Sequence, residues 1–88
     1  MRIEDFDAIR RFVEQACVRH RADILTVTVS KRVARFVICK KSRYPCLELR
    51  SLKYLEPIED DISQEMGRRG WNIDTDCNNG TIGVELKP

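Results

Sequence analysis

The stretch Leu25–Cys39, LTVTVSKRVARFVIC, decides the fold. Its first part, Leu25–Ser30, alternates aliphatic with hydroxyl side chains, which is the two-residue period of a half-buried strand. The part Val33–Cys39 is rich in β-branched and aromatic residues and predicts an antiparallel partner strand. Ser30–Arg32 then forms the tip of a hairpin, although it lacks the glycine that favours the tightest turns.

An amphipathic helix is predicted before this hairpin, over Asp5–His20. Its apolar residues recur at steps of three and four, which places them on one helix face: Phe6, Ile9, Val13, Ala16 and Cys17. Asp5 is the predicted N-cap, because its carboxylate can accept hydrogen bonds from the first free N–H groups of the helix.

A third strand and a second helix are predicted after the hairpin. The strand covers Cys46–Leu52 and follows a basic loop that ends at Pro45. Pro57 is predicted to open the helix, because proline is favoured at the first helical position and three acidic residues follow it closely. Gly67 or Gly70 ends the helix. Its buried face carries Ile58, Ile62 and Met66.

The chain closes with a second hairpin. Trp71–Cys77 and Ile82–Leu86 alternate in polarity, and Asn78-Asn79-Gly80 between them favours a tight turn. The predicted order is therefore α-β-β-β-α-β-β, an α+β fold in which two helices cover one face of an antiparallel sheet. At 88 residues the chain is expected to form a single domain, 1–88.

Charge is divided unevenly along the sequence. Residues 1–55 carry 13 Lys and Arg against 6 Asp and Glu, whereas residues 56–88 carry 3 against 8. The formal net charge of +2 therefore hides a basic part and an acidic part. Such asymmetry bears on the choice of partners and hardly at all on the fold.

Two candidate binding faces follow from this division. The basic face consists of Arg19, Arg21, Lys31, Arg32, Arg35, Lys40, Lys41, Arg43 and Arg50. It suits an acidic protein or, as the alternative function, direct binding of nucleic acid by residues 19–53, with Tyr44 or Tyr54 available for stacking on a base. The acidic face consists of Glu59, Asp60, Asp61, Asp74 and Asp76. It lacks the ligand spacing of a calcium loop and suits a basic protein partner better than a metal.

The four cysteines are spread along the chain without a C-x-x-C pair, so we expect free thiols and a cytoplasmic protein. Cys17 and His20, three residues apart on one helix, could offer two zinc ligands, and Cys39 and Cys46 could complete the set. This spacing is looser than that of known zinc motifs, so we predict no metal and no cofactor. No signal peptide and no membrane-spanning run of residues is recognisable.

No catalytic motif is present, and His20 is the single imidazole available to a nucleophilic mechanism. We therefore expect a non-catalytic binding protein that uses complementary charge. Its expected partner is a protein or a protein–nucleic-acid complex, and small regulators or inhibitors, including phage-encoded ones, have this size and charge pattern. An uncovered edge strand would also allow a homodimer.

Overall fold

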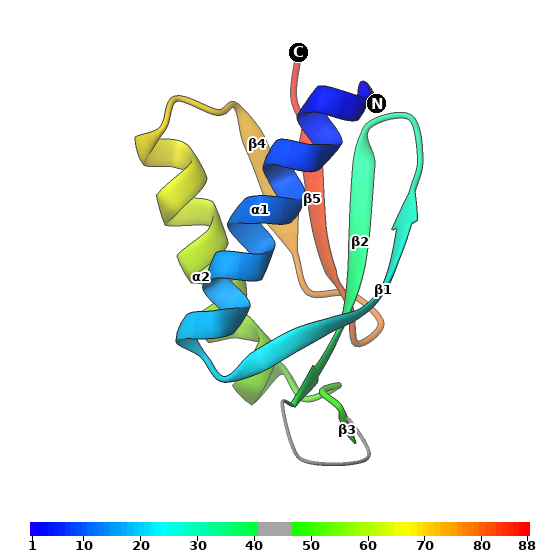
Figure 1. The fold of residues 1–88 in the computed structure, drawn as a ribbon, viewed down its shortest axis with the longest axis vertical. Helices are drawn as coiled ribbons and strands as arrows, with labels where there is room; N and C mark the ends of the chain where they lie inside the picture. The colour runs from blue at the N-terminus through cyan, green and yellow to red at the C-terminus, as the bar shows by residue number, and fades with distance from the viewer. Residues whose placement is uncertain (41–46) are drawn as a thin grey trace.

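The computed structural model describes residues 1–40 and 47–88, and it confirms the α+β fold and the predicted order of elements (Figure 1). The elements are α1 Ile3–Arg19, β1 Ala22–Val29, β2 Val33–Lys40, β3 Leu47–Glu48, α2 Leu52–Arg68, β4 Ile73–Asp76 and β5 Ile82–Leu86. Neither helix in these ranges is long and apolar enough to cross a bilayer.

All strand pairs in the sheet are antiparallel, and the strands lie in the order β1-β2-β5-β4. The central strand β2 is shared by three partners. β1 runs along one side of it, β5 pairs with Val33–Phe36 on the other side, and β3 pairs with Cys39 and Lys40 beyond the end of β5. Both helices lie on one face of the sheet, as predicted (Figure 1).

One core lies between the helices and the sheet. Its largest fully buried side chain is Phe36, at the middle of β2. Around it pack the buried faces of the other elements: Ile9 and Val13 from α1, Leu55, Ile58, Ile62 and Met66 from α2, and Ile82 and Val84 from β5. Burying one such side chain contributes about 1.5–3 kcal/mol, so this set supplies the main stabilising free energy of the fold.

Helix α1 begins two residues earlier than the sequence predicts. Arg2 is its N-cap and makes no side-chain capping bond, so the prediction that Asp5 caps the helix is wrong. Asp5 lies in the first turn, where its carboxylate still interacts favourably with the helix dipole. Met1 and Phe6 pack against the core, and this packing compensates for the missing side-chain cap.

Helix α2 also begins earlier, at Leu52, and the prediction that Pro57 opens it is wrong. Ser51 is the N-cap, and its side chain accepts a hydrogen bond from the N–H of Lys53 at 3.3 Å. Pro57 therefore lies inside the helix, where it has no N–H for the carbonyl four residues earlier. The cap and the burial of Leu55 compensate for that missing bond.

The end of α2 matches the expectation for Gly70, which has φ +85°. The N–H of Trp71 bonds to the carbonyl of Met66, and that of Gly70 bonds to the carbonyl of Gly67, which is the Schellman arrangement. Trp71 is half-buried and meets Phe12 of α1 edge to face, with ring centroids 6.4 Å apart. This contact ties the end of α2 to α1.

The strands differ from the sequence prediction in two places. A bulge between Ile24 and Thr26 leaves Leu25 without a partner on β2, and both Leu25 and Val29 are about half exposed. The third strand is shorter than Cys46–Leu52: it covers Leu47–Glu48, and Cys46 lies outside the described residues. The turn of the last hairpin is confirmed, with φ near +55° at Asn79 and +69° at Gly80.

A basic and apolar cleft as the candidate functional site

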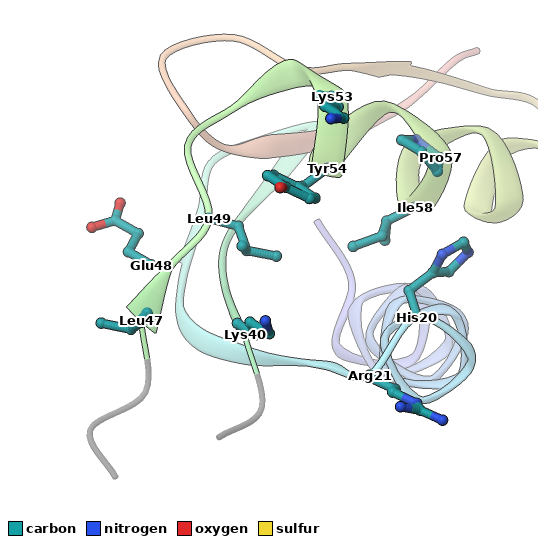
Figure 2. Close-up of a pocket in the computed structure, with 10 residues that line it drawn as sticks. All are labelled: His20, Arg21, Lys40, Leu47, Glu48, Leu49, Lys53, Tyr54, Pro57 and Ile58. Carbon is teal, nitrogen blue, oxygen red and sulfur yellow. The ribbon is translucent and has the colours of Figure 1, made fainter. Parts of the chain in front are cut away.

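A cleft of about 610 Å³ opens where the end of α1, the paired ends of β2 and β3 and the start of α2 meet (Figure 2). Ten described residues line it: His20, Arg21, Lys40, Leu47, Glu48, Leu49, Lys53, Tyr54, Pro57 and Ile58. Its volume is within the usual range for binding sites, about 300–1,000 Å³. The fold thus brings together residues from four elements that are distant in the sequence.

The floor of the cleft is apolar. Ile58 is buried and continues into the core, and Leu49 is half-buried beside it. Leu47 and Tyr54 are 59% and 55% exposed, which is high for side chains of this size. Apolar surface that is left open inside a concavity marks a binding site more often than scattered surface hydrophobes do.

The rim of the cleft is basic. Arg21 follows α1, Lys40 ends β2 and Lys53 lies in the first turn of α2, so the three cations come from three elements (Figure 2). The Lys53 ammonium is 5.9 Å from the centroid of the Tyr54 ring, a cation–π distance. The positive rim and the apolar floor suit a ligand that is both anionic and apolar.

One carboxylate, that of Glu48, lies among the described lining residues. Arg50 accompanies it, with 3.3 Å between Arg50 Nε and Glu48 Oε1. The charge of Glu48 is therefore offset from outside the cleft, and the rim remains positive.

Arg21 has an unusual backbone conformation, with φ +55°. It follows the helix cap residue His20, and its N–H bonds to the carbonyl of Val18 at 3.3 Å. Glycine is the usual residue at this left-handed position, since a Cβ there costs about 1–2 kcal/mol. Strained backbone of this kind is concentrated at functional sites.

Next to the cleft, Asp61 of α2 holds the end of α1. Arg19 donates two hydrogen bonds to its carboxylate, at 2.8 and 2.7 Å, and His20 Nε2 lies 3.2 Å from Oδ2. The hydrogen bonds from Arg19 are the main reason why the pKa of Asp61 is lowered and that of Arg19 is raised. This cluster fixes His20 at the edge of the cleft.

A second pair joins the two predicted faces on the open side of the sheet. Arg35 of β2 donates to both carboxylate oxygens of Asp76 of β4, at 2.8 and 3.1 Å, and to Thr81 Oγ1 at 3.2 Å. Gly83 of β5 lies between the two strands, paired with Arg35 on one side and Asp76 on the other. A Cβ on Gly83 would be 2.9 Å from Arg35 Nη1, so its absence makes room for the ion pair.

The remaining residues of the predicted basic face are scattered. Arg21 and Lys40 line the cleft, whereas Lys31 and Arg32 form the tip of the β1–β2 hairpin. Within the described ranges, Lys31 and Arg32 make no ion pair. Arg50 pairs with Glu48, and Lys41 and Arg43 lie outside the described residues. The basic residues thus form a cleft rim and a separate hairpin tip.

The remaining acidic residues do not gather into a single site either. Glu59 accepts a hydrogen bond from the Cys77 thiol at 3.3 Å, and Asp74 lies 3.5 Å from the Lys87 ammonium. Asp60 is exposed on α2. Burial and Glu59 together raise the pKa of Cys77 to about 12, so this thiol stays protonated at neutral pH.

The expectation of free cysteines holds for Cys17 and Cys77 but is wrong for Cys39, which is disulfide-bonded. A disulfide depends on how close two Cα atoms come in the folded chain, which cysteine spacing in the sequence does not reveal. Burial raises the pKa of Cys17 to about 12, which makes it a poor metal ligand or nucleophile. Among the described residues, no three His, Cys, Asp or Glu side chains gather as a metal site would require.

Sequence reasoning missed the floor of the cleft. Leu47 and Leu49 look like ordinary strand residues, and Pro57 looks like a helix start. The one available signal was Lys53-Tyr54, a cation next to an aromatic residue at the edge of an apolar segment. No family model matches the chain, and no curated protein matches its sequence. Its function therefore has to be argued from the site.

Proposed function

We propose that the chain is a non-catalytic binding protein for a macromolecular partner, a small regulator or inhibitor of a protein or of a protein–nucleic-acid complex. The observation that carries this proposal is the cleft, in which Arg21, Lys40 and Lys53 surround an exposed apolar floor. Cations at a rim attract and orient a partner, while the desolvated centre of an interface supplies most of the affinity.

The internal ion pairs narrow the choice of partner. Arg19 with Asp61, and Arg35 with Asp76, each neutralise one residue of the predicted basic face with one of the predicted acidic face. Of the predicted basic face, Arg21 at the cleft rim and Lys31-Arg32 at the hairpin tip make no ion pair within the described ranges. An acidic partner fits this surface better than a basic one.

The chemistry of the lining supports binding in preference to catalysis. His20 is the cleft's imidazole, and its Nε2 faces Asp61. Among the described lining residues there is no serine, threonine or cysteine that an imidazole could activate.

A homodimer through the edge strand β1 has less support. The bulge at Leu25 disrupts the regular edge, and the N–H of Ile24 is bonded to the carboxylate of Asp23 at 2.8 Å. Bulges and occupied N–H groups are devices that prevent edge-to-edge pairing.

Affinity capture from the producing cells, with and without nuclease, tests the proposed function. The bait is the full chain, and its R21E/K53E variant reverses two charges at the cleft rim. The control K31E/R32E makes the same change of charge at the hairpin tip. We expect a defined polypeptide that survives nuclease, is lost with R21E/K53E and is retained with K31E/R32E. The proposal would be contradicted if the polypeptide is lost after nuclease treatment, or if the R21E/K53E variant recovers as much of it as the native chain does.

Direct binding of nucleic acid is the second candidate, favoured by the exposed Lys31-Arg32 tip and by Tyr54 beside Lys53. It predicts a gel shift with a single-stranded oligonucleotide, with an affinity that falls steeply as salt rises. In that case K31E/R32E would weaken the shift as strongly as R21E/K53E does.

A further inference from the structure

We infer that the cleft binds an acidic peptide segment of a protein partner, with one aliphatic or aromatic side chain on the floor and carboxylates at the rim. This inference rests on the proposed function and names the partner's chemistry. Three observations support it: the apolar floor of the cleft, its basic rim and the mostly aliphatic side chains among its described lining residues.

The floor is shaped for a side chain. Ile58 and Leu49 close its base, and Pro57 adds a rigid ring in the first part of α2 (Figure 2). Leu47 and Tyr54 are the exposed apolar groups beside it. In Figure 2 the Tyr54 ring lies beside Leu49 and Ile58, whereas the Leu47 side chain points away from them. An apolar anchor placed here would cover Tyr54 and bring it out of water, which is the usual role of an interface hot spot.

The rim is shaped for carboxylates. Arg21 follows α1 and Lys53 lies at the start of α2, on opposite sides of Leu49 and Ile58 in Figure 2, with the Arg21 guanidinium turned outward. Carboxylates on both sides of an anchor would therefore meet a cation at each outer edge of the rim. The first turn of α2 contains no acidic residue, so no carboxylate of that turn offsets the positive end of the helix dipole. Arg21 also keeps a backbone conformation that glycine would adopt at a lower free-energy cost.

The lining favours a peptide over a nucleic acid. Of the five apolar residues in its described lining, Tyr54 is the aromatic one, and the Lys53 ammonium already lies over that ring. Bases bind by stacking on aromatic faces, and one covered ring is a poor platform. Aliphatic walls instead suit the side chain of a leucine, isoleucine or phenylalanine.

A peptide selection tests the inference. The full chain is used to select from a phage-displayed library of random nine-residue peptides, and the enriched sequence is synthesised with a fluorescent label. We expect Asp or Glu on both sides of one apolar residue. Replacing that residue by serine, or the acidic residues by their amides, should weaken binding at least tenfold in fluorescence anisotropy.

Variants place the bound peptide. R21E/K53E should weaken it at least tenfold, and Y54A severalfold, whereas K31E/R32E should change affinity less than twofold. Circular dichroism confirms that each variant is folded, and the substituted positions are all exposed enough to change without harming the core. A peptide that binds R21E/K53E as well as it binds the native chain would overturn the inference.

Two further outcomes separate this inference from the proposed function. If no acidic, apolar consensus emerges while cellular capture still depends on R21E/K53E, the peptide chemistry is wrong and the proposed function stands. If an unlabelled twelve-residue oligouridine displaces the peptide in a way that requires Tyr54, the cleft is a nucleic-acid site and the inference fails. If the cleft variants capture the same polypeptide as the native chain does, both the inference and the proposed function are wrong.

Discussion

Arg21 connects backbone strain to the proposed site. An arginine with φ +55° stands where glycine would be more stable, and its side chain lines the basic rim. The backbone alone would favour glycine at this position, and the proposed function gives the arginine side chain a role there.

Arg21→Gly should therefore stabilise the protein and weaken it as a binder. Relief of the left-handed strain, less the added freedom of the unfolded chain, should raise the free energy of unfolding by about 0.5–1 kcal/mol. Urea denaturation measures this gain, and anisotropy measures the loss of peptide affinity. Arg21→Lys is the matched control, which should keep the affinity and show no gain. A stability loss in Arg21→Gly would show that the arginine side chain itself supports the fold.

Gly83 makes a different contribution, because it gives space to the Arg35–Asp76 pair. In Gly83→Ala the new Cβ meets Arg35 Nη1 at 2.9 Å and Asp76 Oδ2 at 3.0 Å, so the pair must move. We expect the free energy of unfolding to fall by about 1 kcal/mol. In a chain that already carries R35S/D76S, the same change should be neutral or stabilising by about 0.5 kcal/mol. Equal effects in both backgrounds, measured by urea denaturation, would show that the glycine is not coupled to the pair.

Asp61 makes part of the stability depend on pH. Its pKa is lowered in the folded chain by Arg19, so its contribution is present above about pH 4 and is lost as the pH falls through the lowered value. Asp61→Asn should reduce the free energy of unfolding at pH 7 by about 0.5–1 kcal/mol, a small value because Arg19 is largely exposed. The difference from the native chain should vanish near pH 2. A difference that persists there in thermal denaturation would assign the effect to packing.

At the scale of elements, α2 combines a good cap with a poor interior residue. Ser51 begins the helix, and Pro57 interrupts its hydrogen-bond ladder one turn later. The same proline forms part of the cleft floor, so a local defect in the helix coincides with the proposed site. Departures from local preference of this kind are expected where a chain binds something.

Pro57→Ala should restore the missing hydrogen bond. We expect a gain of about 1–2 kcal/mol in the free energy of unfolding, smaller than the full effect of a helix proline because the unfolded chain also gains freedom. Peptide affinity should fall severalfold with the loss of the ring. Glu56→Ala, an exposed neighbour in the same turn, controls for helix propensity alone. If Pro57→Ala gives no larger gain than Glu56→Ala, the helix has already adapted to the proline.

Elements with a strong local signal could be predicted from the sequence. The spacing of apolar residues in α1 and the Asn79-Gly80 turn are patterns of neighbouring residues, and the structure confirms both the helix and the turn. The start of α2 was missed because a proline followed by acidic residues resembles a helix start, and packing of Leu55 outweighs it. The cleft depends on four elements meeting in space, so no local pattern could reveal it.

At the scale of the whole molecule, the charged residues of the basic and acidic parts of the sequence fall into two groups. One group forms ion pairs within the fold, where Arg19 pairs with Asp61 and Arg35 pairs with Asp76. Arg21 at the cleft rim and Lys31-Arg32 at the hairpin tip lie outside these pairs, and the proposed function assigns them to a partner. A count along the chain treats both groups alike, which explains why the sequence suggested two separate charged faces.

These two pairs also bear on how quickly the chain finds its structure. Each joins residues far apart in sequence, 42 positions for Arg19 and Asp61 and 41 for Arg35 and Asp76. Closing such loops is slow, and attraction between a basic stretch and an acidic one favours the encounter before any native contact exists. We expect the refolding rate in stopped-flow fluorescence of Trp71 to fall severalfold between 0.02 and 1 M salt, because screening shortens from about 20 Å to about 3 Å. A rate that rises with salt would mean that repulsion within each stretch outweighs attraction between them; a falling rate would make the uneven charge a guide to folding as well as to binding.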